Sequence, residues 1–133
     1  MNVLLDSHVV LWWYAESSHL SRTARRVIDD ALKLFVSPIS CWEIALLSAR
    51  KRVRLDRDVY EWTNEVLNAD RVSEAPLSPS AAISAALMGS EFPGDPADRF
   101  LYATAKDLGI PLVTRDESIR GYARTNHDVR VIW

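Results

Sequence analysis

The sequence predicts an α/β domain with a central, mostly parallel sheet of about five strands that is sandwiched by helices. Short, continuous apolar runs rich in branched and aromatic side chains recur along the chain, as is typical of strands buried on both faces. Amphipathic segments separate these runs, and such alternation favours parallel pairing through right-handed crossovers. No repeat or long linker interrupts the pattern, so residues 1–133 are expected to form one domain.

Four apolar runs are the expected strands. They are Val3–Leu5, which Asp6 closes, then Lys33–Pro38, Ile110–Thr114 and Val129–Trp133. A weaker strand is expected between Val72 and Leu77. Runs this short and this apolar fit a sheet that is covered on both sides.

Amphipathic or capped segments between these runs predict helices. Ala24, Val27, Ile28 and Ala31 recur at spacings of three and four, which is the apolar stripe of a helix. Proline in the first helical position opens two others, and Gly109 is a suitable residue to end one. The predicted helices are Ser21–Lys33, Ser40–Lys51, Asp58–Leu67, Pro79–Met88 and Asp95–Leu108, and Asp6 and Asp116 could each cap a further helix that follows them.

Composition and charge exclude several classes of protein. The hydrophobic fraction of 48% and charged fraction of 26% are those of a globular protein, not of a disordered chain. The longest apolar run, Val9–Ala15, is far short of the roughly 20 residues that span a bilayer. Cys41 is the single cysteine, so no disulfide can form within the chain and a reducing, cytoplasmic location is expected. With a net charge of −2, any nucleic-acid contact must rely on local basic patches.

Four acidic residues fall where the predicted topology can bring them together. Asp6 and Asp116 follow strands, and Glu43 lies in the first turn of the helix after the second strand. Since the carboxyl ends of parallel strands share one edge of a sheet, these three are expected to converge. Asp98, in the first turn of the helix that Asp95 begins, joins them if residues 89–97 bend toward that edge.

Each of these acids also has a purely structural explanation. Ser40 and Glu43 have the spacing of a capping box, and Asp95 is a good N-cap before Pro96. Asp98 would then be a favourable first-turn acid. A carboxylate has about four acceptor positions, so capping a helix and binding a ligand are compatible.

Carboxylates that share one pocket repel one another, and a divalent cation is the simplest neutraliser. A set of oxygen ligands with no His or Cys cluster favours Mg²⁺ or Mn²⁺ over zinc. Asp6 and Asp98 are the expected closest ligands, with Glu43 and Asp116 acting through water or holding a second ion. Such a site performs attack of a metal-activated water on a phosphodiester. The hydroxyls of Ser7 and Thr114 either orient that water or cap the strand ends.

Four segments, in this order and spacing, resemble the PIN-domain family, and most closely its VapC toxins of type II toxin–antitoxin pairs. The segments are Leu4–Trp13, Ser37–Ala45, Asp95–Ala105 and Pro111–Asp116. The resemblance implies an α/β/α sandwich and a Mg²⁺- or Mn²⁺-dependent endoribonuclease whose acidic quartet is Asp6, Glu43, Asp98 and Asp116, with Asp95 as an unassigned fifth acid. It further implies a homodimer, a small VapB-like antitoxin as partner, and structured RNA (tRNA or rRNA) as substrate.

Several residues are candidates for contact with RNA. Arg99 and Arg115 adjoin proposed ligands and are expected to hold the substrate backbone. The basic segment Arg50–Arg57 either contacts phosphate or is a solvated helix end. The tryptophans are expected to make core or subunit contacts rather than to stack on bases, because they fall on helix stripes with Leu and Val; they are Trp12, Trp13, Trp42 and Trp62.

Two non-nuclease classes also fit an α/β chain with acids at strand ends. A receiver-like signalling module would need a phosphorylatable Asp at the end of a central strand and a Lys near the last one. Here the second run ends in Ser37 and Pro38, and Arg115 stands near the last strands, so this class fits poorly. A protein-binding module in which the acids only cap helices remains the other alternative.

Overall fold

A five-stranded sheet forms the centre of the protein in the computed structural model, which describes residues 1–133. All neighbouring strands are parallel, and their order is β3-β2-β1-β4-β5. The strands are β1 (Asn2–Leu5), β2 (Lys33–Val36), β3 (Val72–Glu74), β4 (Leu112–Val113) and β5 (Val131–Ile132). The predicted sheet is therefore confirmed, including its weakest strand.

The sheet extends to both sides of β1. Leu4 of β1 pairs with Phe35 of β2 on one side and with Leu112 of β4 on the other. The first half of the chain builds the sheet outward through β2 and β3, and the second half builds it through β4 and β5. Strand order thus reverses between β1 and β4, and open parallel sheets build their sites at the carboxyl side of such a point.

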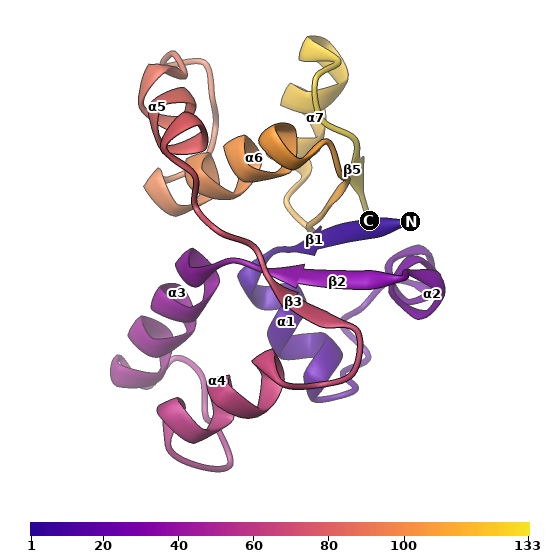
Figure 1. The fold of residues 1–133 in the computed structure, drawn as a ribbon, viewed down its shortest axis with the longest axis vertical. Coiled ribbons are helices and arrows are strands. Elements are labelled where there is room, and N and C mark those ends of the chain that lie inside the picture. The colour runs from indigo at the N-terminus through magenta and orange to yellow at the C-terminus, as the bar shows by residue number, and fades with distance from the viewer.

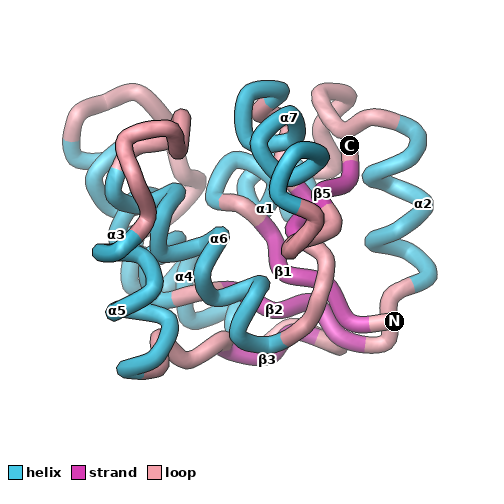
Figure 2. Tube along the Cα trace, turned by 90° about the horizontal axis from the view of Figure 1, so that it is seen from above, coloured by secondary structure: helices cyan, strands magenta, loops and turns pink.

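Helices cover both faces of this sheet. One face carries α1 (Ser7–Tyr14), α2 (Arg22–Asp30), α3 (Pro38–Ala49) and α4 (Val59–Leu67) (Figure 1). The other carries α5 (Pro79–Leu87), α6 (Pro96–Leu108) and α7 (Glu117–Asn126), and Figure 2 looks onto the sheet from this side. None of the seven helices combines the length and apolarity that crossing a bilayer requires.

The two layers of core follow from the alternation of side chains along β1. Val3 and Leu5 point into a cluster with residues of α1 to α4, whereas Leu4 points into a second cluster with residues of α6 and α7. All three side chains are fully buried. A strand with both faces covered has to be apolar at every position, which explains the continuous run after Asn2.

The predicted start of α3 is wrong. The helix begins at Pro38, with Ser37 as its N-cap, instead of at Ser40. The Ser37 hydroxyl accepts a hydrogen bond from the N–H of Ile39 at 3.0 Å, and the fixed φ of proline suits the first helical position. Glu43 therefore lies in the second turn, not the first, and the predicted Ser40–Glu43 capping box does not form, because the Ser40 N–H donates to the Ser37 carbonyl.

The other predicted helices are confirmed, with their ends shifted by a few residues. Helices do follow Asp6 and Asp116, as α1 and α7. Gly109 ends α6 in the left-handed conformation, with φ of 66°, which glycine adopts without strain. The N-terminus of α6 is in this way fixed by Asp95 and its C-terminus by Gly109.

Candidate metal-dependent active site

The four acids whose convergence was predicted line one cavity of about 400 Å³ at the carboxyl edge of the sheet. Asp6 follows β1 and Asp116 follows β4, on either side of the point where strand order reverses. Glu43 comes from α3 and Asp98 from α6. We call this cavity the acidic pocket; its lining is Asp6, His8, Trp12, Glu43, Asp95, Asp98, Arg115 and Asp116.

Three of the acids cap helices as well as lining the pocket. Asp6 is the N-cap of α1, Asp95 of α6 and Asp116 of α7. Asp95 and Asp98 form a reciprocal capping box, in which each carboxylate accepts the backbone N–H of the other residue, at 2.9 and 3.1 Å. Three helix N-termini consequently lie at the pocket, and their partial positive charge favours anionic groups there.

Glu43 differs from the other acids because no backbone N–H donates to its carboxylate. Its Oε1 accepts a hydrogen bond of 2.6 Å from the hydroxyl of Ser7, the buried first residue of α1. Ser7 Oγ also lies 3.1 Å from the hydroxyl of buried Ser40. The carboxylate of Glu43 is thus oriented by a tertiary contact and does not cap a helix.

Thr114 connects the acids that follow β1 and β4. Its hydroxyl donates to Asp6 Oδ2 at 2.8 Å and accepts the N–H of Asp116 at 3.2 Å. The Ser7 N–H donates to the other oxygen of Asp6 at 2.7 Å. The hydroxyl protons of Thr114 and Ser7 are both directed at carboxylates, so these residues hold Asp6 and Glu43 in place instead of presenting a free donor to a water.

The pocket brings together five carboxyl groups, none of which forms an ion pair, and Arg115 is the one Lys or Arg in its lining. Burial, followed by the charges of Asp6 and Asp95, raises the pKa of Asp98 to about 8. Burial likewise raises the pKa of Asp6, despite the hydrogen bonds from Thr114 and Ser7 that favour its charged form. The pKa of Glu43 is also raised by burial, with further contributions from the charges of Asp6 and Asp95. Such shifts concentrate at sites that are completed by a ligand.

The donor set fits a hydrated hard dication. Every carboxylate in the pocket offers oxygen, and the lining contains one histidine, His8, and no cysteine. No group of three or more Asp, Glu, His or Cys side chains is close enough together to hold a metal ion by itself, so waters would have to complete the coordination. Mg²⁺ keeps several waters and takes only one or two protein carboxylates directly, so it suits an open arrangement of this kind.

Comparison with known proteins shows the family to which the chain belongs. Residues 3–125 match the family model of the PIN domain. The chain belongs to the PIN domain family. It is 43% identical over 120 residues to Ribonuclease VapC22 of Mycobacterium tuberculosis, a match that covers 90% of this chain and 91% of that protein. The PIN domain described here is therefore of the VapC type.

Solved structures show the same fold at lower identity. A DNA-bound VapBC from Salmonella typhimurium matches with a TM-score of 0.66 and 17% identity, over 98% of this chain and 96% of that one. VapBC-1 from nontypeable Haemophilus influenzae matches with the same TM-score and coverage at 16% identity. At such identities the likeness concerns the fold alone.

The two arginines predicted to hold RNA lie in different surroundings in this PIN domain. Arg115 lines the acidic pocket, with its guanidinium 5.7 Å from the ring centre of Trp12. Arg99 does not line the pocket: it donates to the carbonyls of Met88 and Gly89, at 2.7 and 3.1 Å. The geometry gives Arg99 a structural role, because it ties α6 to the residues that end α5.

Sequence reasoning missed three residues of the site. His8 and Trp12 line the acidic pocket from α1, where their rings pack together at 5.6 Å. Their i, i+4 spacing was the available signal. Gly94 permits a close approach, since a Cβ there would lie 2.5 Å from the Cβ of Asp98.

Burial and ion pairing describe the surroundings of the remaining aromatic and basic residues, and a phosphate contact by Arg50–Arg57 stays a prediction. Trp62 is buried, and Trp12 and Trp13 are half-buried against the same core cluster, which confirms their core contacts. For Trp42 the predicted core contact is wrong, since it is 57% exposed on α3, and a subunit contact stays a prediction. In the basic segment Arg50–Arg57, Arg57 is paired with Asp56 and Glu65, whereas Arg50 and Arg52 line a cavity beside the acidic pocket.

Proposed function

We propose that this VapC-type PIN domain, residues 1–133, is a cytoplasmic Mg²⁺- or Mn²⁺-dependent endoribonuclease, the toxin of a toxin–antitoxin pair, and that it cuts structured RNA such as tRNA or rRNA. The observation that carries the proposal is the meeting of Asp6, Glu43, Asp98 and Asp116 in one pocket. Similarity to Ribonuclease VapC22 over nine-tenths of both chains supports the same activity.

Each side chain of the pocket has a role in this proposal. Asp6 and Asp98 are the closest metal ligands, and Glu43 and Asp116 act through water or at a second ion. Thr114 and Ser7 fix the carboxylates of Asp6 and Glu43 through hydrogen bonds. Arg115, at the rim, attracts the phosphate that the acids alone would repel. When bound, Mg²⁺ or Mn²⁺ would lower the pKa of the attacking water and offset the charge that develops on the phosphodiester.

The direct test is cleavage of RNA in the presence and absence of metal. Purified protein incubated with total RNA and Mg²⁺ or Mn²⁺ is expected to release defined fragments, and EDTA is expected to abolish their formation. Gel electrophoresis of end-labelled RNA measures both. Cleavage that continues unchanged in EDTA would contradict the metal dependence, and the absence of cleavage with every RNA class would contradict the nuclease.

The alternative, a binding module whose acids only cap helices, predicts a different response to metal. A ligand that binds only the folded state must raise its stability, by about 2.7 kcal/mol at a concentration 100 times its dissociation constant. A melting temperature that does not move with Mn²⁺ would therefore favour the binding module. Glu43 argues against that alternative, since its carboxylate caps no helix.

Thr114→Val is expected to reduce cleavage by about 10- to 100-fold, because it removes the hydrogen bond that holds Asp6 without changing side-chain shape. The matched control is Thr104→Val on α6, since Thr104 is equally buried but donates to the carbonyl of Phe100, away from the pocket. Initial rates at saturating metal measure the effect. Equal rates for the two variants would mean that Thr114 does not position a catalytic group.

The proposed partners are a small VapB-like antitoxin and a second copy of this chain. The Salmonella and Haemophilus proteins of the same fold were solved as VapBC, which supports the antitoxin. For the second copy, α5 exposes Ile83 and Leu87, one turn apart, by 60% and 78%. Apolar side chains in this position on a helix are typical of an interface.

Leu87→Glu is expected to halve the molar mass measured by light scattering, because it places a charge in the proposed dimer interface. Leu32→Glu is the matched control, since Leu32 is 72% exposed but lies beside β2 on the other half of the molecule. A wild-type protein with the mass of one chain would contradict the homodimer.

A further inference from the structure

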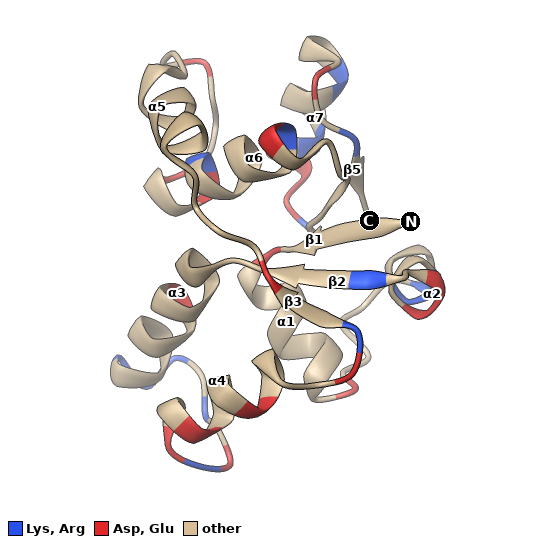
Figure 3. Cartoon of the chain, in the orientation of Figure 1, with Lys and Arg blue, Asp and Glu red and all other residues tan.

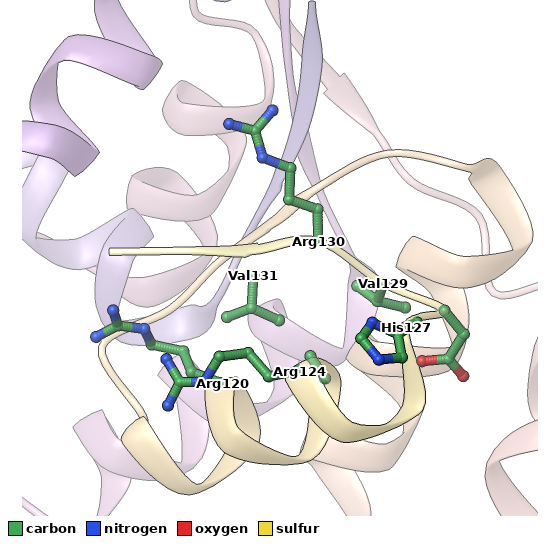
Figure 4. A pocket seen from close by; sticks show the side chains of 8 residues that line it. Arg120, Arg124, His127, Val129, Arg130 and Val131 are labelled. Atoms are coloured by element: carbon green, nitrogen blue, oxygen red, sulfur yellow. The ribbon is translucent and has the colours of Figure 1, made fainter.

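A second charged cavity lies outside the acidic pocket, between α7 and the segment that leads into β5 (Figure 4). Its volume is about 450 Å³. We call it the basic groove; its lining is Arg120, Ala123, Arg124, His127, Asp128, Val129, Arg130 and Val131. Figure 3 shows Lys and Arg segments on α7 and at the start of β5, in agreement with this lining.

Arg120 and Arg124 form the cationic wall of the basic groove. They lie one turn apart on α7, about 6 Å along its axis, and their side chains extend in the same direction (Figure 4). Arg130 points away from α7 in the same view. No carboxylate lies within 4 Å of Arg120 or Arg124, so both positive charges are free of ion pairs.

The one carboxylate in the basic groove is already engaged. Asp128 accepts a hydrogen bond of 2.5 Å from the hydroxyl of Tyr102 and lies 3.5 Å from the ammonium of Lys106. The negative charge of Asp128 is thus partly offset by the ammonium of Lys106, which does not line the groove. The net character of the groove is positive, in a chain whose overall charge is −2.

The acidic pocket and the basic groove share no lining residue, but α7 connects them: its N-cap lies in the pocket and its later turns line the groove. Arg115 and Asp116 line the acidic pocket and stand at the start of α7. Asp116, Arg120 and Arg124 follow one another at intervals of four residues and so share a face of that helix. A chain of phosphates with one member at the acidic pocket would meet cations at successive turns of α7.

We propose that Arg120 and Arg124 bind the phosphate backbone of the RNA on one side of the cleaved bond. This inference rests on the proposed function and adds where the substrate lies. Arginine is suited to the site because its planar guanidinium forms paired hydrogen bonds with phosphate. An RNA backbone is favoured over an acidic protein segment because the row of cations begins at a pocket built to act on a phosphodiester.

The test is binding of a fluorescent single-stranded RNA of about 20 nucleotides, a length that spans several phosphate contacts. Fluorescence anisotropy in EDTA measures binding without cleavage, over a salt range of about 50 to 200 mM. Arg120→Gln/Arg124→Gln is compared with Arg22→Gln/Arg26→Gln, which removes the same charge from exposed positions on α2, outside the basic groove.

The groove variant is expected to bind the RNA about tenfold more weakly. A plot of its log association constant against log salt concentration is expected to have a slope smaller in magnitude by about 0.7 for each lost phosphate contact. The α2 variant is expected to bind as the wild type does. Equal weakening in both variants would show a general charge effect and overturn the proposal. No weakening in either would overturn it as well, and would leave the groove to another partner such as an acidic protein segment.

Failure of this inference and failure of the proposed function give different results. A wild-type protein that cuts RNA with Mg²⁺, together with a groove variant that binds the RNA probe as tightly as the wild type does, overturns only the basic groove. A wild-type protein that cuts no RNA under any metal condition overturns the nuclease itself.

Discussion

Asp98→Asn is expected to reduce RNA cleavage by about three orders of magnitude and, at the same time, to stabilise the metal-free protein. The loss follows because a metal in such a site contributes several kcal/mol of transition-state stabilisation, and each 1.36 kcal/mol is a factor of ten in rate. Asparagine keeps the helix start intact, since its side-chain oxygen can still accept the Asp95 N–H that now lies 3.1 Å from Asp98 Oδ2.

The gain in stability has a separate physical cause. Burial and the charges of Asp6 and Asp95 raise the pKa of Asp98, so its ionised form is unfavourable in the folded state at neutral pH. A neutral amide removes this repulsion. Because the side chain is only half-buried and solvent screens part of the charge, the gain is expected to be about 1 kcal/mol, or roughly 4 °C in melting temperature.

Asp107→Asn serves as the matched control for both effects. Asp107 lies at the other end of α6 and accepts a hydrogen bond of 2.7 Å from Ser78, which an amide oxygen can also accept. Its cleavage rate and melting temperature are expected to equal those of the wild type. Wild-type cleavage by Asp98→Asn would remove Asp98 from the site, and a lower melting temperature would mean that its charge stabilises the fold.

The fold was predictable because the central strands β1 and β4 are apolar at nearly every position, as their burial requires. A run such as Val3–Leu5 is apolar at consecutive positions only if both faces of its strand are covered. The start of α3 was harder to predict, because Ser37 and Ser40 are both acceptable N-caps and only the position of Pro38 decides between them. The sequence also gave no bounds for α1, whose residues are so apolar that no helical stripe stands out.

The meeting of the four acids was predictable from topology, but the contacts of the side chains around them were not. Strand order places Asp6 beside Asp116, yet the hydrogen bond from Thr114 that links their loops spans 108 residues of sequence. Arg99 shows the reverse error: it adjoins Asp98 in sequence, but one residue along a helix turns a side chain by about 100°, and it contacts the end of α5 instead. Neighbours in sequence are not neighbours in a helical site.

The metal-free protein is expected to lose stability as pH rises from about 4 to about 8. An acid whose pKa is higher in the folded state than in the unfolded state binds more protons when folded across that interval. Its stabilising contribution is present below the unfolded pKa and is lost as pH rises through the folded pKa. Asp98, with a folded pKa of about 8, sets the upper limit of the interval, and Asp6 and Glu43 act in the same direction.

Denaturant unfolding in EDTA at several pH values measures this loss, which is expected to be about 2 kcal/mol after allowance for screening. Asp98→Asn is expected to show a smaller loss, whereas Asp107→Asn is expected to follow the wild type. Saturating Mg²⁺ is expected to reverse the trend, because the ion binds only deprotonated carboxylates and binds them more strongly as pH rises. If Mg²⁺ left the pH dependence of the free energy of unfolding unchanged, the acids of the pocket would not be metal ligands.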